Sequence, residues 1–381
     1  MAKRARGGPP PAHHGSHPSD RRPRTRPAPR RSTALELTFL PGLESLVADE
    51  AAEVLLLDGA PSPVPGREDA LDVATWGPPA DVLGLRTAVA AFLVLRFDVP
   101  RPKSLTSGDH LTRIVDAMYT SLRTGSSSTF RFEAAGSDSA VFARLADLLA
   151  EATGLRYDEA QGELVLRVRR GVRPGPSGDP GWDVLVRLGS RPLSARRWRV
   201  TDYPGAVNAT IAAAMVRLGE VREQDRVLNL MCGSGTLLVE RLSAGPAADA
   251  VGVDLSADAL TASAENLGAA AHAGDARLLT ADCTGPALVE AAGAGWDLLL
   301  ADPPWGTLHG THATNAEVHA GMLQAAYDAA ALGARFVVLT HEVKVMERCL
   351  RDADALWRIR STTKVFAKGH HPRIYVLDRT A

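Results

Sequence analysis

The second half of the chain alternates short apolar runs with longer stretches that have a helical apolar pattern. We predict helices over the longer stretches, for example residues 257–267 and 316–332. The short runs predict buried strands at residues 226–230, 250–254, 277–280, 297–301 and 336–340. Short apolar strands joined by helices are typical of a parallel, doubly wound α/β sheet. The last two runs, 359–366 and 374–377, are joined by a short Gly- and Pro-containing loop and predict an antiparallel hairpin.

The chain between residues 33 and 190 mixes helices and strands in smaller groups. Leu35, Leu37 and Phe39 alternate as in a strand, and a helical pattern follows at 43–57. The other predicted strands of this half are 71–74, 89–97, 129–133, 163–169 and 182–188, and the other helices are 111–122 and 141–153, the last ending at Gly154. Elements of this size predict compact α/β accessory domains. We therefore divide the chain into domains at 33–103 and 104–190, a linker at 191–201 and a doubly wound domain at 202–381.

Charge is distributed unevenly along the chain. Residues 1–31 hold nine of the 43 Lys and Arg residues and one of the 44 acids, so the remainder of the chain is net acidic. This segment is rich in Pro, Gly and His and cannot bury a core, which predicts a disordered basic tail over residues 1–32. Two interpretations stay open for the tail: an arm for anionic RNA, or a solvated extension.

Composition excludes several classes of protein. No apolar run approaches the roughly 18 residues that a membrane span needs, and no secretory signal is visible, so we expect a cytoplasmic protein without membrane contact. The three cysteines lie far apart and form no CxxC pair, which argues against a zinc site or a disulfide framework. His309 and His312 have a spacing compatible with a metal, but no third ligand is indicated, and we predict no metal site.

A glycine turn follows the first strand of the predicted doubly wound sheet. Cys232-Gly233-Ser234-Gly235 lets the backbone approach a ligand closely, with its N–H groups facing the ligand. Asp254 ends the next strand, 19 residues after Gly235, where a carboxylate can accept hydrogen bonds from ribose hydroxyls. Asp282 follows the third strand and can contact an adenine edge. We therefore expect a nucleotide-like cofactor at the carboxyl ends of these strands.

The identity of that cofactor follows from what the turn lacks. A dinucleotide fingerprint needs a third glycine, and Leu238 stands at that position. Because no other pyrophosphate cradle is present, a cofactor with adenosine and no pyrophosphate fits best. S-adenosylmethionine is the expected cofactor.

A second turn, Asp302-Pro303-Pro304-Trp305, directly follows the fourth strand of this sheet. The Asp302 carboxylate and the Pro303 carbonyl can both accept hydrogen bonds from an exocyclic aromatic amine and orient it toward the methyl donor. Trp305 offers a face on which a flipped base can stack. We predict Asp302, Pro303 and Trp305 as the catalytic residues; the alternative is a plain structural turn.

Two groups of arginines are candidates for RNA contact. The linker carries Arg196, Arg197 and Arg199 around Trp198, which is expected to be an exposed aromatic residue. A linker held by ion pairs is the alternative for this group. The second group, in the accessory half, consists of Arg167, Arg169, Arg170 and Arg173.

These motifs resemble those of the THUMP-domain RNA guanine-N2 methyltransferases, especially the tRNA enzymes that act on the acceptor stem. Residues 231–236 are similar to the family's Met-Cys-Gly-Ser-Gly-Thr motif, residues 302–306 to its Asn/Asp-(Leu/Pro)-Pro-Tyr-Gly motif, and residues 203–206 to the segment before the first motif. The resemblance implies an N-terminal ferredoxin-like domain, a THUMP domain and a Rossmann-like methyltransferase domain. It also implies cofactor-binding roles for Pro204, Asn229, Cys232, Gly233, Ser234, Gly235 and Thr236, beside Asp254 and Asp282.

The chain departs from the family at two site positions. Asn229-Leu230 replaces Asp-Pro, which leaves a neutral side chain where the family has a carboxylate for the cofactor's amino group. Trp305 replaces Tyr and enlarges the stacking surface. The sequence thus favours a cytoplasmic, S-adenosylmethionine-dependent tRNA guanine-N2 methyltransferase, with a monomer preferred and the oligomeric state open. The alternatives are an rRNA guanine-N2 or adenine-N6 methyltransferase, or a catalytically weak RNA-binding module.

Overall fold

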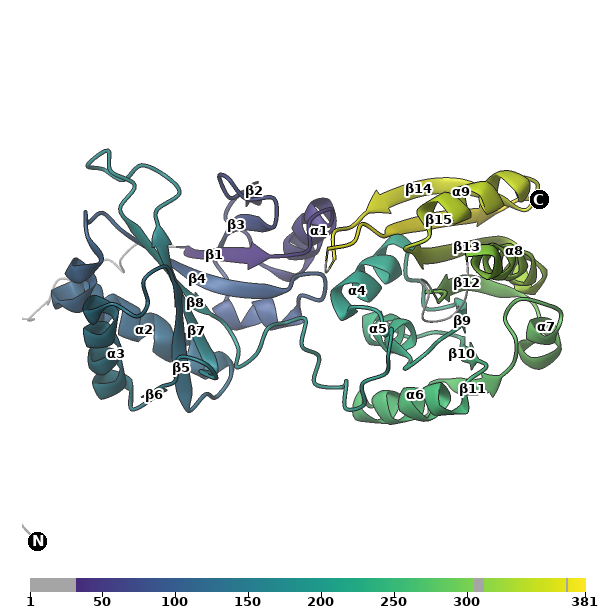
Figure 1. Cartoon of the computed structure of the whole chain (residues 1–381), viewed down its shortest axis with the longest axis horizontal. Helices are drawn as coiled ribbons and strands as arrows, with labels where there is room; N and C mark the ends of the chain where they lie inside the picture. Colours follow the sequence, from purple (N-terminus) through teal and green to yellow (C-terminus); the bar gives the residue numbers. More distant parts are fainter. Residues whose placement is uncertain (1–31, 305–311, 368) are drawn as a thin grey trace, which may run out of the picture. The chain divides into compact units, whose positions relative to one another are not determined.

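The computed structural model describes residues 32–304, 312–367 and 369–381, which form two β-sheets with their helices (Figure 1). The predictions for the basic tail, for Trp305 and for His309 lie outside the described residues, and so does the side chain of His312. Within the described part of the chain, no helix is long and apolar enough to cross a membrane. The same residues contain no group of three or more His, Cys, Asp or Glu side chains that could hold a metal ion.

The first sheet has eight strands and contains both predicted accessory segments. Its strand order is β2-β3-β1-β4-β8-β7-β5-β6. The bounds are β1 (Thr33–Thr38), β2 (Ser62–Pro63), β3 (Ala70–Thr75), β4 (Ala90–Phe97), β5 (Thr129–Ala134), β6 (Arg156–Tyr157), β7 (Leu164–Arg170) and β8 (Trp182–Arg187). Antiparallel pairing of β4 with β8 joins the strands before residue 103 to those after it. The two expected accessory domains therefore share one sheet, and the boundary between them stays a prediction.

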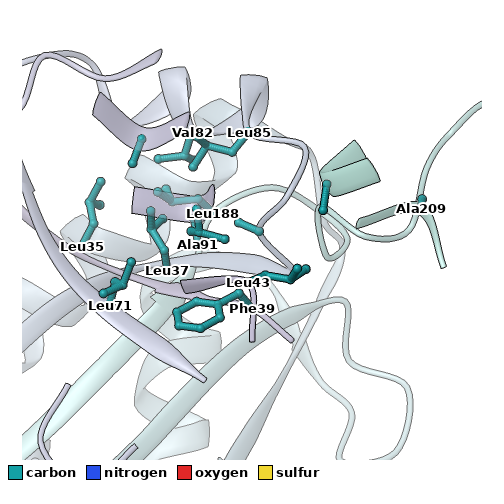
Figure 2. Packing of buried hydrophobic residues seen from close by; sticks show 14 of the residues in the cluster. Leu35, Leu37, Phe39, Leu43, Leu71, Val82, Leu85, Ala91, Leu188 and Ala209 are labelled. Carbon is teal, nitrogen blue, oxygen red and sulfur yellow. The ribbon is translucent and has the colours of Figure 1, made fainter. Parts of the chain in front are cut away.

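One face of this sheet carries the larger core. Leu35, Leu37 and Leu71 point from their strands into a cluster that includes Val82 and Leu85 (Figure 2). The helices of this half are α1 (Glu44–Val54), α2 (Gly108–Thr124) and α3 (Ala140–Thr153), with short 3-10 helices η1 (Pro79–Gly84) and η2 (Pro102–Thr106). They supply apolar residues at helical spacing, such as Ile114 and Met118 of α2. The predicted end of α3 at Gly154 is confirmed, because this glycine caps the helix in the left-handed conformation at φ +74°.

The second sheet confirms the predicted doubly wound fold. Its seven strands have the order β11-β10-β9-β12-β13-β15-β14. The bounds are β9 (Arg226–Leu230), β10 (Asp249–Asp254), β11 (Arg277–Thr280), β12 (Trp296–Ala301), β13 (Ala330–Thr340), β14 (Trp357–Lys364) and β15 (Arg373–Arg379). Each hydrogen-bonded pair of strands within β9 to β13 is parallel. Strand β15 is antiparallel to both β13 and β14, as the hairpin prediction requires.

Six described helices accompany this sheet. They are α4 (Ala209–Leu218), α5 (Thr236–Ala244), α6 (Ala257–Ala269), α7 (Ala287–Ala292), α8 (His312–Ala329) and α9 (Val343–Asp352). The helix predicted over 316–332 ends earlier, at Ala329, and the strand predicted at 336–340 begins at Ala330. The difference has a long-range cause: Ala330 pairs with Trp296 at the start of β12, and this pairing overrides the local helical pattern.

A buried ion pair holds the amino-terminal end of this sheet. Asp225, just before β9, accepts a 2.6 Å hydrogen bond from Arg335 of β13. Arg241 of α5 lies 3.8 Å from the other carboxylate oxygen and donates to the carbonyls of Gly245 and Pro246. All three side chains are almost fully buried. This cluster lies at the opposite strand ends from the predicted site and is structural.

Candidate functional site

Strand order reverses between β9 and β12, and the glycine turn begins where β9 ends. Met231, Gly233 and Gly235 all have positive φ angles, of 49°, 54° and 75°. A Cβ atom at Gly235 would overlap the hydroxyl of Ser263, so α6 can approach the turn only if this residue is glycine. Thr236 then begins α5. The turn thus lies at the topological switch point, where ligands bind in open parallel sheets.

Asp254 is held against this turn at the end of β10. Its Oδ2 accepts a 2.8 Å hydrogen bond from the Gly233 N–H, and its Oδ1 accepts a 2.9 Å bond from the Ser256 N–H. A carboxylate oxygen can accept more than one hydrogen bond, so both oxygens keep capacity for a ligand. The two backbone donors fix the orientation of the carboxylate before any ligand arrives.

A cavity of about 640 Å³ joins the glycine turn to the Asp302 turn. This volume lies within the usual range for small-molecule sites. Nine of the predicted site residues line it: Pro204, Cys232, Gly233, Ser234, Thr236, Asp254, Asp282, Asp302 and Pro303. The structure therefore brings together residues at or just after the ends of β9, β10, β11 and β12, from Cys232 to Pro303 in the sequence, and adds Pro204 from the segment before α4.

Two predicted cofactor residues do not line the cavity. Gly235 is the last residue of the turn and lies next to Ser263 of α6, away from the cavity lining. Asn229 is fully buried within the sheet, where its Nδ2 donates to the carbonyls of Leu230 at 3.2 Å and Leu300 at 3.1 Å. A carboxylate could not make these two donations. In this chain the side chain of Asn229 therefore ties β9 to β12, and the contact with the cofactor's amino group implied by the resemblance has no geometric support.

Asp302, at the end of β12, has an unusual environment for a carboxylate. Burial raises its pKa from 3.8 to about 7. Its Oδ1 atom is inaccessible to solvent and has no hydrogen-bond partner among the residues that the structure describes. A buried group with a pKa near neutrality in a ligand-sized cavity is a candidate for proton transfer or for binding a polar hydrogen donor.

Several cavity residues have no signal in the sequence analysis. Leu255 follows Asp254 and is 67% exposed, so it presents an apolar surface at the cavity wall. Cys283 and Val318 also line the cavity, from the segment after β11 and from α8. The position of Leu255 directly after Asp254 is a sequence signal that it lies at the cavity. The presence of Val318 at the cavity depends on how α8 packs, which no local pattern predicts. Burial raises the pKa of the Cys232 thiol well above its usual value, which agrees with a small residue packing the turn.

The linker arginines are engaged within the protein. Arg196 Nε donates to Glu240 at 2.8 Å, and Arg199 donates to the Val207 carbonyl and the Thr236 hydroxyl, both at 2.9 Å. Arg197 is exposed. The expectation that Trp198 is exposed is wrong: it is 8% exposed and packs in the main hydrophobic cluster. These contacts fit a linker held by polar interactions.

The second arginine group is paired with acids of the first sheet. The shortest ion pairs are Arg167–Glu133 at 3.0 Å, Arg169–Glu36 at 2.6 Å, Arg170–Asp179 at 3.0 Å and Arg173–Asp72 at 2.7 Å. Arg169 is the least exposed of the four, because Glu36 is fully buried beneath it. None of the four lines the cavity at the glycine turn.

Comparison with known proteins agrees with this geometry. A protein-family model described as UPF0020, an RMKL-like methyltransferase domain, matches residues 196–373. A tRNA (guanine(6)-N2)-methyltransferase from Thermus thermophilus is 30% identical over 358 residues, which cover 91% of this chain and 99% of that protein. The mouse tRNA (guanine(6)-N(2))-methyltransferase THUMP3 is 23% identical over 211 residues, 52% of this chain and 41% of the mouse protein.

Solved structures give the same answer for the fold. The crystal structure of TrmN from Thermus thermophilus has a TM-score of 0.68 and 25% identity, and the match covers 91% of this chain and all of that one. SMU.472, a methyltransferase solved in complex with SAH, has a TM-score of 0.63 over 92% of this chain; at 13% identity it supports the fold alone. The chain therefore belongs to the family of the Thermus thermophilus tRNA (guanine(6)-N2)-methyltransferase.

Proposed function

We propose that this protein is an S-adenosylmethionine-dependent tRNA methyltransferase that acts on the exocyclic N2 of a guanosine. The observation that carries the proposal is the single cavity that joins the glycine turn and Asp254 to the Asp302-Pro303 turn. A cofactor bound at the first part would lie next to an amine held at the second. The relatives named tRNA (guanine(6)-N2)-methyltransferase support guanosine at position 6 of tRNA as the target.

The residues present fit the adenosine half of the cofactor. Asp254 keeps acceptor capacity for the two ribose hydroxyls, and Leu255 offers an apolar surface for the adenine ring. Asp282 is exposed at the cavity wall and can accept from the adenine amino group. The buried hydroxyl of Ser234 has no hydrogen-bond partner among the described residues, so it is available to a polar group of the ligand. When bound, S-adenosylmethionine supplies a methyl group activated by its sulfonium charge.

The remaining chemistry belongs to Asp302 and Pro303. The lone pair of a guanine amino group is delocalised into the ring, which makes it a poor nucleophile. Hydrogen bonds from this amine to the Asp302 carboxylate and the Pro303 carbonyl would orient its lone pair toward the methyl group. The amine must lose a proton once its nitrogen is methylated. A carboxylate whose pKa is about 7 can accept that proton near neutral pH.

The other parts of the chain have supporting roles in this proposal. The segments 33–103 and 104–190, with their shared sheet, would dock the structured RNA, and Trp305 would stack on the flipped base. Among the arginines, Arg197, Arg170 and Arg173 are more exposed than Arg169 and are better placed to exchange protein contacts for phosphates. We place the enzyme in the cytoplasm, with its tRNA substrate, and expect a monomer.

Transcripts that differ in a single base test the proposed function. Purified protein and S-adenosylmethionine are incubated with an unmodified tRNA that carries guanosine, inosine or adenosine at position 6, and nucleosides are identified by mass spectrometry. N2-methylguanosine should form only on the guanosine transcript, because inosine lacks the N2 amine. N6-methyladenosine on the adenosine transcript would favour the adenine alternative. The same assay is run on rRNA and on U6 snRNA, which the name of one mouse relative gives as its substrate. If either RNA is methylated and tRNA is not, the proposal of tRNA as the substrate is wrong.

A further inference from the structure

One wall of the cavity is formed by the segment that leads into the methyltransferase domain. Residues 203–207 line the same cavity as the glycine turn. They come directly after the linker and before α4, and they form no helix or strand of their own. A wall of this kind needs contacts from neighbouring elements if it is to keep one position relative to the glycine turn.

Asn266 of α6 supplies such contacts just before the wall begins. Its Oδ1 accepts from the N–H groups of Val200 at 3.0 Å and Thr201 at 3.1 Å. Its Nδ2 donates to the carbonyls of Thr201 and Ser234, both at 3.1 Å. The amide therefore uses both donors, and its oxygen accepts two bonds, which is its full hydrogen-bonding capacity. One side chain thus joins the linker to the glycine turn.

Arg199 makes a second connection that spans the wall. A single nitrogen of its guanidinium donates to the Val207 carbonyl, at the far end of the wall, and to the Thr236 hydroxyl at the start of α5. Between these two connections, the Tyr203 hydroxyl donates to Ser256 Oγ at 3.3 Å. Both ends of the 203–207 wall are therefore tied to the elements that flank the glycine turn.

The buried amide of Asn266 is not explained by packing of α6 alone. Asn266 is fully buried and lies near the end of α6, where an apolar side chain would pack without any need for partners. Burying an amide is unfavourable unless its groups are hydrogen-bonded. Here every bond that compensates this cost goes to the backbone of the linker or of the glycine turn, and none goes to α6 itself.

We propose that Asn266 is a positioning residue for cofactor binding. It does not line the cavity. It acts through Ser234 and Thr201, by holding the 203–207 wall and the glycine turn at the separation that the ligand requires. Arg199 completes this arrangement at the other end of the wall. The inference rests on the proposed function, because it takes S-adenosylmethionine as the ligand.

The test separates cofactor affinity from turnover. Wild type, Asn266→Ala and Asn266→Asp are titrated with S-adenosylhomocysteine by calorimetry, and their steady-state constants are measured on tRNA. We expect the Kd, and the KM for S-adenosylmethionine, to rise at least tenfold in both variants, with kcat at saturating cofactor within about threefold of wild type. The aspartate keeps the two acceptor bonds but loses both donations, to the carbonyls of Thr201 and Ser234, so it removes the direct bond to the glycine turn and keeps two of the three bonds to the linker. Arg199→Met, which keeps an unbranched side chain but has no donor for the Val207 carbonyl or the Thr236 hydroxyl, should move the same constants and serves if Asn266→Ala fails to fold.

Asp225→Asn is the matched control, because it weakens a buried polar cluster at the opposite strand ends. It should lower the melting temperature and leave the Kd unchanged. If Asn266→Ala and Asn266→Asp bind with wild-type affinity and differ only in melting temperature, Asn266 is merely structural and the inference is wrong. A fall in kcat with an unchanged KM would also overturn it. Wild-type protein without affinity for S-adenosylhomocysteine would instead overturn the proposed function, and the inference with it.

Discussion

Two carboxylates, Glu36 of the first sheet and Asp302 of the second, have opposite surroundings. In the first sheet, Glu36 is fully buried and lies 2.6 Å from Arg169 and 3.2 Å from Arg67. In the second sheet, the Oδ1 atom of Asp302 is inaccessible to solvent and has no hydrogen-bond partner among the described residues, and desolvation raises the pKa of this half-buried carboxyl to about 7. Both carboxylates lie on or directly after a strand. The difference is that the first is neutralised by its neighbours and the second is not.

This contrast separates structural charges from functional ones. A paired carboxylate contributes to stability and has little left to offer a ligand, whereas an unpaired buried carboxylate costs stability and stays available for chemistry. We therefore expect substitutions in the first sheet to change stability, and substitutions at the ends of β9, β10 and β12 to change catalysis.

The largest effect is expected at Asp302. Asp302→Ala should lower the rate of methyl transfer by several orders of magnitude with little change in affinity for S-adenosylhomocysteine, because the contribution of the carboxylate is made mainly in the transition state. Single-turnover rates and calorimetric titration measure the two quantities separately. A variant that methylates tRNA at nearly the wild-type rate would make the Asp302 turn structural only.

The next effect is expected at Asp254. Asp254→Ala would remove the proposed charge-assisted contact with the ribose, which contributes about 1.5–3 kcal/mol, so cofactor affinity should fall by at least about tenfold. The carboxylate also accepts from Gly233 and Ser256, and part of the loss will come from the freed turn. Asp258→Ala, on the exposed start of α6, is the matched control. Equal affinity in both variants would remove Asp254 from the cofactor site.

A smaller effect is expected on deletion of residues 1–31. Folding and turnover on saturating RNA should stay close to wild type, while the KM for tRNA rises a few fold. If the arm contacts phosphates, the dependence of RNA affinity on salt should also become gentler. An unchanged salt slope would show that the tail takes no part in binding, and loss of folding would mean that the predicted domain boundary is misplaced.

The smallest effect on methyl transfer is expected at Glu36. Glu36→Gln leaves Arg169 and Arg67 without their shared carboxylate, which should lower the free energy of unfolding by a few kcal/mol. The kcat and the Kd for S-adenosylhomocysteine should not change. Chemical denaturation and calorimetry of the same preparation test both statements. A loss of kcat larger than the loss of folded protein would contradict the purely structural role of Glu36.

The sequence predicts the second sheet better than the first for a physical reason. Strands such as 226–230 and turns such as 232–235 are defined by residues next to one another, and parallel order then brings Asp254 and Asp302 to the same edge. Pairing of β4 with β8 depends on residues about 90 positions apart, and no local pattern specifies it. Partners of arginines such as Arg169 are set by this long-range pairing too.

Single side chains at the site show the same limit. The resemblance implies a cofactor contact for Asn229, whereas in the structure its side chain donates to the carbonyls of Leu230 and Leu300 and does not line the cavity. Asn266 carries no motif and appears as an ordinary polar residue in a helix. Its importance emerges only when α6, the linker and the glycine turn are placed together.

The titration of Asp302 tests the central claim most directly. A pKa raised from 3.8 to about 7 means that the folded protein favours the protonated form, so the carboxylate that accepts from the amine forms only as the pH rises through about 7. The logarithm of the single-turnover rate should therefore increase with pH, with a slope near one, and level off above pH 7–8. The same shift predicts that Asp302→Asn gains stability relative to wild type as the pH rises from 4 to 8. A rate that is independent of pH between 5 and 8, with no such gain, would contradict the account.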